Sequence, residues 1–175
     1  MRNVESAAER LLNEHSVVRP PVPVEQLAKA LGLSVQYEHY DGDISGLLYR
    51  DSNVSIIGVN AAHSMTRQRF TIAHELGHFM LHRGRPLIVD KQFRINFRNS
   101  ASSLATDHEE IQANGFAATL LMPRGWVEKA ALRLIRRLES LSDDDLVERL
   151  ASRFNVSPQA MSFRLINLGL RSPSD

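Results

Sequence analysis

The chain has 175 residues, 43% hydrophobic and 23% charged, a composition typical of one globular domain with a buried core. It contains no cysteine, which excludes disulfides, thiolate metal sites and a cysteine nucleophile. The formal net charge of +1 excludes a globally basic nucleic-acid binder. The sequence has neither a signal peptide nor an apolar run of about 20 residues. We therefore expect a cytoplasmic protein that does not enter membranes.

The first third of the chain predicts two helices followed by strands. Apolar residues at helical spacing mark each helix, and Pro20, Pro21 and Pro23 separate the two. A polar turn between the second and third apolar strand segments indicates an antiparallel hairpin. The predicted elements are helices over residues 4–14 and 24–31 and strands over residues 33–40, 44–49 and 54–59.

The remainder of the chain predicts mainly helices. Residues 84–106 have no clear period and are expected to be a loop, after which Asp107 is a candidate N-cap. Ser142 precedes three acids and Ser157 precedes Pro158, and both patterns are typical of helix starts. The predicted helices cover residues 66–83, 107–121, 123–138, 142–154 and 157–169.

These elements predict an α+β fold in which a small antiparallel sheet packs on helices. We expect residues 1–140 to form the main domain. Residues 141–170 resemble a helix-turn-helix pair that packs on or completes that domain, and residues 171–175 form a tail.

The segment His74-Glu75-Leu76-Gly77-His78 matches the pattern H-E-x-x-H. Residues four apart on a helix share one face, so His74 and His78 can bind one zinc ion at about 2.0–2.1 Å. Glu75 lies beside them and is the expected general base for a zinc-bound water. The alternative interpretation is that these are ordinary core or surface histidines.

The rest of this helix favours the metal interpretation. From Phe70 to His82 it contains no Lys or Arg, and apolar residues cover most of its circumference. Such a helix is expected to be buried on all sides, and its buried polar groups then need partners, for which a metal ion is suitable. The polar positions form one stripe of Thr71, His74, Glu75, His78 and His82.

A catalytic zinc site has three protein ligands and one open position. His82 continues the stripe, but it lies about 12 Å along a straight helix from His74. Both cannot bind one ion with His78 between them. We therefore expect His82 to contact a ligand or the helix end rather than the metal.

Glu110 is the better candidate for the third ligand. It shares a helix face with Asn114, which is placed to orient a zinc-binding histidine. Small residues, Ala113 and Ala117, flank this face and permit a close helix approach. A solvated acid at position 110 is the alternative, since acids are favoured near a helix N-terminus. In that case His108 would be the fallback ligand.

Beyond these single motifs, the chain resembles the ImmA/IrrE family of metallo-endopeptidases over about residues 20–170. The resemblance is carried by residues 69–78 (RFTIAHELGH), by residues 110–117 (EIQANGFA) with the following Leu120-Leu121-Met122-Pro123, and by residues 154–170. Val59-Asn60 resembles the strand end that precedes the family's zinc helix. One departure is Gln112, where many relatives have Glu, and we expect little loss from it.

The resemblance implies a zincin-like fold and gluzincin-type chemistry with one catalytic zinc ion. It implies that His74, His78 and Glu110 are the ligands and that Glu75 is the general base. It also implies a protein substrate, a helix-turn-helix transcriptional repressor, whose cleavage relieves repression. The biological setting would be a stress response, a mobile element or a toxin–antitoxin system.

Three further residues are candidates for contacting substrate or stabilising the oxyanion: Tyr49, His63 and His108. The hairpin edge near residues 54–60 is a candidate for binding an extended peptide by strand addition.

Two other classes of function remain open. The first is a DNA-binding regulator that uses the pair over residues 142–170, although Arg164 is the one cation between Ser157 and Leu168. Basic residues at 91–98 and at 129–137 can contact nucleic acid, an acidic partner or only water. The second class is a non-catalytic partner-binding protein stabilised by zinc, in which the intact Glu75 would have no evident role. The oligomeric state stays open.

Overall fold

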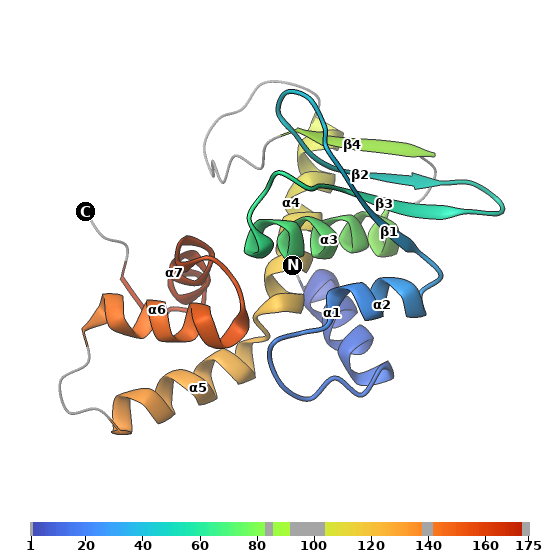
Figure 1. Cartoon of the computed structure of the whole chain (residues 1–175). Coiled ribbons are helices and arrows are strands. Elements are labelled where there is room, and N and C mark those ends of the chain that lie inside the picture. Colours follow the sequence, from blue (N-terminus) through green and yellow to red (C-terminus); the bar gives the residue numbers. More distant parts are fainter. Residues whose placement is uncertain (1, 83–85, 92–103, 138–141, 173–175) are drawn as a thin grey trace.

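The computed structural model describes residues 2–82, 86–91, 104–137 and 142–172. The helices are α1 (Arg2–Glu14), α2 (Val24–Ala30), α3 (Met65–Leu81), α4 (Leu104–Leu121), α5 (Arg124–Arg137), α6 (Asp143–Phe154) and α7 (Pro158–Asn167). The strands are β1 (Ser34–Glu38), β2 (Ile44–Arg50), β3 (Ser55–Asn60) and β4 (Leu87–Lys91). The predicted α+β fold is confirmed: the sheet covers one side of α3, and α1 and α2 lie on the other side (Figure 1).

The sheet is mixed, whereas the sequence predicted an antiparallel one. Its strand order is β1-β3-β2-β4. The predicted hairpin between β2 and β3 is confirmed, but β1 pairs with β3 in parallel. The chain reverses twice between β1 and β3, so β3 returns in the direction of β1 and lies beside it. As an inner strand, β3 has no free edge, and the expected strand addition at residues 54–60 is therefore wrong.

Strand β4 lies in the segment that was predicted to be a loop. It pairs with β2 in antiparallel orientation, and Ile88 packs opposite Leu48. Three apolar residues from Leu87 to Val89 are too few to show a period, so the unpaired edge of β2 determines this strand. Residues 92–103 of the same predicted loop lie outside the described residues. Helix α4 begins at Leu104, three residues before the predicted N-cap at Asp107.

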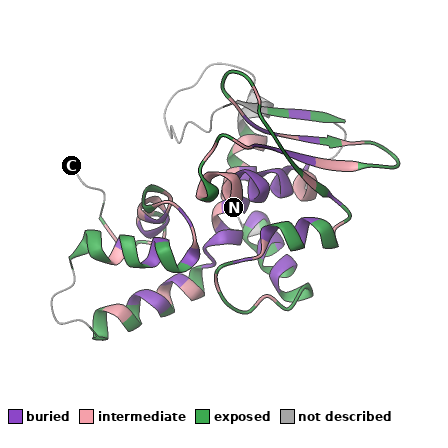
Figure 2. Ribbon diagram, in the orientation of Figure 1, coloured by how far each residue is buried: buried purple, intermediate pink, exposed green. Residues whose placement is uncertain are grey.

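Helix α3 is the central element of the fold. All residues from Thr71 to His78 are buried, which confirms the predicted helix with no solvated face (Figure 2). The sheet approaches α3 closely at Gly46 of β2, where an added Cβ would lie 2.3 Å from Cγ2 of Thr71. Position 46 therefore requires glycine for the sheet to cover the helix.

The C-terminal pair α6–α7 belongs to the same hydrophobic cluster as the rest of the protein. Its helices begin as predicted: the Ser142 side chain accepts from the Asp145 amide, and Ser157 accepts from the Ala160 amide. Arg171, which was expected to begin a tail, instead forms an ion pair with Asp144 of α6. Residues 173–175 lie outside the described residues.

Two arginines connect the α6–α7 pair to earlier parts of the chain. Arg69 of α3 donates from Nε to the carbonyl of Asn155 at 3.1 Å and from a terminal nitrogen to the carbonyl of Val22 at 2.9 Å. Arg164 of α7 donates from Nε to the carbonyl of Met122 at 2.9 Å.

Among the described residues, no helix is long and apolar enough to cross a membrane.

We expect Arg69→Met to lower the free energy of unfolding by roughly 2–4 kcal/mol, because it removes two hydrogen bonds of a charged donor between segments distant in sequence. Urea unfolding followed by circular dichroism measures the change. Arg10→Met on the exposed side of α1 is the control and should change stability by about 0.5 kcal/mol or less. Equal stability of the two variants would contradict this role of Arg69.

Candidate metal centre

Three predicted ligands converge between α3 and α4. One ligand atom from each of His74, His78 and Glu110 lies within 4.8 Å of the other two. The Nε2 atoms of the two histidines are 3.0 Å apart, and each is 3.3 Å from a carboxylate oxygen of Glu110. Atoms bound to one tetrahedral zinc ion at 2.0–2.1 Å lie about 3.3–3.4 Å apart. The spacing and the donor types therefore fit a divalent metal ion.

The approach of α4 to α3 depends on the glycine inside the H-E-x-x-H segment. A Cβ at Gly77 would lie 3.0 Å from Cα and 3.1 Å from the carbonyl oxygen of Ala113. The small residues Ala113 and Ala117, predicted to permit a close approach, are both fully buried. Because the two backbones come this close, Glu110 lies one turn before the contact and reaches the histidine pair.

Asn114 lies on the outer side of His74. Its Oδ1 atom is 3.1 Å from Nδ1 of His74. Since a carboxamide oxygen only accepts hydrogen bonds, this contact assigns the ring proton to Nδ1. The Nε2 lone pair of His74 then faces Glu110 and His78, which is the form that binds a metal.

His82 and Gln112 do the same for His78 through a longer chain of hydrogen bonds. Nδ1 of His82 is 3.1 Å from Nδ1 of His78, and Nε2 of His82 is 2.9 Å from Oε1 of Gln112. If Gln112 accepts from Nε2–H of His82, then Nδ1 of His82 is free to accept from Nδ1–H of His78. The Nε2 lone pair of His78 then faces the cluster.

Gln112 and His82 have positions in the site that the sequence did not connect. His82 was expected beside a ligand or at the helix end, and the structure places it at both, as the C-cap residue of α3. Little loss was expected from Gln112 in place of Glu, and Gln112 supplies an acceptor oxygen that orients His82, as Glu would. No pattern in the sequence links residues 82 and 112, because their contact exists only where the two helices cross.

Glu75 is fully buried beside the sheet. Its carboxylate lies at Gly46, where an added Cβ would be 3.2 Å from Oε1. Glu75 is therefore on the side of α3 that faces β2, while the histidine rings face α4. Glycine at position 46 leaves space for this carboxylate as well as for Thr71.

The charge of Glu110 suits a cation site. Burial raises the pKa of its carboxyl group, but hydrogen bonds and charge interactions with His74 and His78 in their protonated form outweigh burial and lower the pKa to about 2. With neutral rings whose Nε2 lone pairs face the cluster, a bound cation would supply this positive charge instead. The carboxylate therefore stays ionised at neutral pH and complements a positive charge between the two imidazoles.

The three predicted substrate-contacting residues lie outside this cluster. Tyr49 is on β2, is 38% exposed and bonds to Asp51 in the adjoining turn. His63 lies in the connection from β3 to α3, where burial, followed by the nearby Arg67 charge, lowers its pKa. His108 is exposed near the start of α4. Their role in substrate binding stays a prediction.

An α+β fold whose sheet covers an H-E-x-x-H helix, with a glutamate from the following helix, defines a metallopeptidase domain of the zincin-like class. The chain matches the IrrE N-terminal-like domain, Peptidase_M78, over residues 28–166, and it belongs to this family.

Two curated relatives are similar to this chain, and one of them is named as a metallopeptidase. The chain is 27% identical over 130 residues to the metallopeptidase ImmA of Bacillus subtilis strain 168. The aligned region covers 73% of this chain and 66% of the relative. It is 26% identical over 124 residues to the uncharacterized immunity region protein 2 of Bacillus phage phi105. Here the aligned region covers 71% of this chain and 70% of the relative.

We expect Gly77→Ala to separate α3 from α4 and to weaken metal binding, because its Cβ would press on the backbone of Ala113. The measurement is the rise in melting temperature on adding zinc, which should be smaller in the variant. Gly115→Ala on α4 is the matched control, since its Cβ would meet Val4 Cγ1 at an ordinary 3.6 Å. The prediction fails if both variants respond to zinc like the parent chain.

Gln112→Leu removes the acceptor that orients His82 and should weaken zinc binding about tenfold or more. Gln112→Glu keeps an acceptor at this position and should retain affinity. Competition with a chromogenic chelator measures both constants, and Ile111→Ala, on the exposed side of α4, is the control. Equal affinities of the Leu and Glu variants would show that the acceptor has no role.

Proposed function

We propose that the protein is a zinc-dependent endopeptidase that hydrolyses a peptide bond in a protein substrate. The observation that carries this proposal is the convergence of His74, His78 and Glu110 within 4.8 Å on buried, closely packed helices. A His₂Glu donor set with one open position is the arrangement of catalytic zinc in peptidases.

In this proposal His74 and His78 bind through Nε2 and Glu110 binds through its carboxylate. Bound zinc would lower the pKa of a water molecule toward neutrality and polarise the substrate carbonyl. Asn114 and His82 hold the two rings by their outer nitrogens, and Gln112 holds His82. These contacts fix both imidazoles before substrate binds, so little reorganisation is needed.

Glu75 is the general base. It follows His74 in the chain and lies on the adjacent side of α3, against Gly46. A buried carboxylate in this position accepts a proton from the attacking water and then delivers it to the leaving amine. Its burial keeps bulk water from competing for that proton.

Peptide substrates are expected to bind in extended form at an edge of the sheet. The edges are β1 and β4, because β3 and β2 are inner strands. Strand β4 has the more suitable surface, since Leu87 and Val89 are 52% and 43% exposed. We therefore propose that an extended peptide pairs with β4 and not with residues 54–60.

We further propose that the substrate is a helix-turn-helix repressor and that cleavage relieves repression in the cytoplasm. The family match supports a peptidase, and one relative is named as an immunity-region protein of a bacteriophage. A role in stress response or in a toxin–antitoxin system is a variant of the same proposal.

The structure gives little support to DNA recognition by the helical pair. Arg164, the single cation on α7, is only 7% exposed and donates to the carbonyl of Met122. In the described residues, α7 thus presents neither Lys nor Arg to a groove or a phosphate. A non-catalytic zinc protein is disfavoured because it would leave Glu75 without a role.

Glu75→Gln should retain zinc and lose at least about 100-fold in peptidase activity, since the amide cannot accept the proton. His78→Ala should lose both zinc and activity. The measurements are metal content of the purified protein and cleavage of a candidate repressor. Full activity of Glu75→Gln would sink the proposal, and retained zinc in His78→Ala would overturn the ligand assignment.

A further inference from the structure

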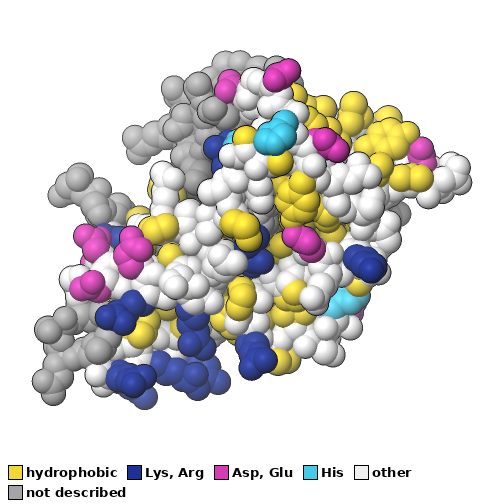
Figure 3. Space-filling model, viewed as in Figure 1, with side chains coloured by type: hydrophobic (Ala, Val, Ile, Leu, Met, Phe, Trp, Pro, Cys, Tyr) yellow, Lys and Arg dark blue, Asp and Glu magenta, His cyan; other side chains and the backbone are white. Residues whose placement is uncertain are grey.

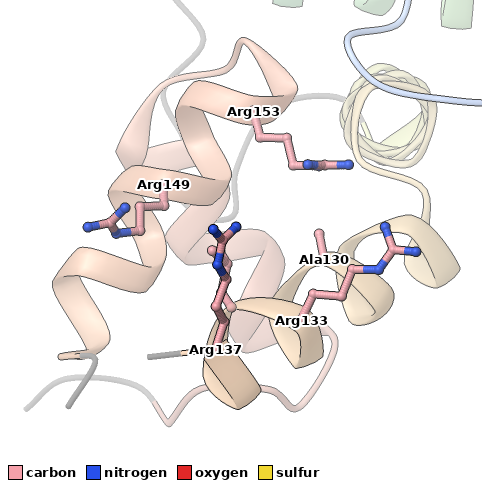
Figure 4. A pocket seen from close by; sticks show the side chains of 6 residues that line it. Ala130, Arg133, Arg137, Arg149 and Arg153 are labelled. Carbon is pink, nitrogen blue, oxygen red and sulfur yellow. The ribbon is translucent and has the colours of Figure 1, made fainter. Parts of the chain in front are cut away.

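A pocket lined by arginines lies between α5 and α6, away from the metal centre. Its volume is about 350 Å³, and four of its six lining residues are Arg133, Arg137, Arg149 and Arg153. Each pair is spaced four residues apart, so each forms a row along one face of its helix. Both pairs line the same pocket from neighbouring helices, and Figure 4 shows Arg137 directed toward α6 and Arg149 directed away from α5.

The four guanidinium groups are available for a partner. All four side chains are exposed, and among the described residues none forms a hydrogen bond or an ion pair. Of the acids on α6, Asp143 and Asp144 pair with Arg171, and Asp145 accepts from the Ser142 hydroxyl. The fourth, Glu148, lies next to Arg149 in the chain but forms no ion pair with it among the described residues.

This surface is a local concentration of charge. Lys129 and Arg136 add to the row on α5, where the four cations fall within a sector of about 100°. The whole chain has 21 Lys and Arg against 20 Asp and Glu, so six cations here leave an excess of acids elsewhere. Figure 3 shows the basic side chains gathered over α5 and α6. The field of such a patch attracts anionic partners.

The floor of the pocket distinguishes between the possible anions. Ala130 and Leu134 line it between the arginine rows. A phosphodiester backbone has no group for an apolar floor, and the lining contains neither the aromatic rings that stack on bases nor the amides that read them. A peptide that combines carboxylates with an aliphatic side chain complements both the rim and the floor, since arginine binds carboxylates in bidentate geometry.

We propose that the pocket between α5 and α6 is a docking site for an acidic segment of a protein that carries an aliphatic anchor. This inference rests on the proposed peptidase function. The partner is then the protein substrate, which is held outside the active site. Helix α5 follows α4 directly in the chain. Along α4, the distance from Glu110 to Leu121, the last residue of that helix, is about 16 Å. Docking here would therefore select substrates by a segment distant from the scissile bond.

The test measures binding without cleavage, using full-length Glu75→Gln protein. The probe is a short fluorescein-labelled peptide that alternates pairs of glutamates with single leucines, and binding is followed by fluorescence anisotropy. Three probes accompany it: the same peptide with glutamine for glutamate, the same peptide with serine for leucine, and a duplex oligonucleotide. We expect the first peptide to bind about tenfold more tightly than each of these three probes. Its affinity should fall as the salt concentration increases.

Arg137→Gln combined with Arg153→Gln should weaken that binding about tenfold, because both rows lose a guanidinium group. The matched control combines Arg10→Gln and Arg19→Gln, two exposed arginines far from the pocket in the sequence, and should bind like the parent. Circular dichroism verifies that both double variants fold. Equal binding by the two double variants would overturn the proposal, and so would tighter binding of the oligonucleotide, which would indicate a nucleic-acid site.

Cleavage by the wild-type chain is assayed separately. If a protein substrate is cleaved but the acidic peptide does not bind, the docking site alone is rejected. If the peptide binds as expected but the zinc-loaded chain cleaves no candidate repressor and Glu75→Gln changes nothing, the peptidase function is rejected, and with it the identification of the docked protein as a substrate.

Discussion

The close crossing of α3 and α4 at Gly77 and Ala113 is the contact on which the metal centre depends. At this point the two helix backbones approach so closely that a Cβ at position 77 would press on the Ala113 backbone. Glu110, Gln112 and Asn114 all lie on α4 near this crossing, and each contacts a histidine of α3 or a neighbour of one. A helix pair held even slightly farther apart would separate all three from their partners.

Burying three histidines and Glu75 beside the half-buried Glu110 requires that their polar atoms be compensated. The outer nitrogens of His74 and His78 have partners in Asn114 and His82, and Gln112 completes the chain. The inner nitrogens face each other and Glu110 at distances that suit a shared cation. This arrangement suits a positive charge at its centre, which is the physical reason for proposing a metal enzyme.

The rest of the chain holds α3 in place and adds surfaces for recognition. The sheet covers α3 from one side, and Arg69 ties its first half both to the proline-rich connector and to the α6–α7 turn. The sequence predicted a helix-turn-helix pair in α6 and α7, but α7 uses its single arginine internally. A group of exposed arginines lies on α5 and α6 instead, where they line a pocket together with Ala130 and Leu134. The proposed chemistry and the proposed docking site thus lie at opposite ends of the α4–α5 segment.

The sequence alone determined the features that depend on residues close together in the chain. Spacing of three or four residues predicted the helices, the shared face of His74 and His78, and the face that joins Glu110 to Asn114. Serine caps located the starts of α6 and α7. The close approach at Ala113 was also foreseeable, because small residues at helical spacing mark a tight contact.

Only the tertiary structure decided what depends on residues far apart in the chain. Strand β4 forms because the edge of β2 is unpaired, and the order β1-β3-β2-β4 makes β3 an inner strand. The link from Gln112 through His82 to His78 joins residues 30 positions apart at the helix crossing. The arginine rows of α5 and α6 line the same pocket for the same reason. Local periodicity sets the face that a helix presents, but packing between distant segments sets what that face meets.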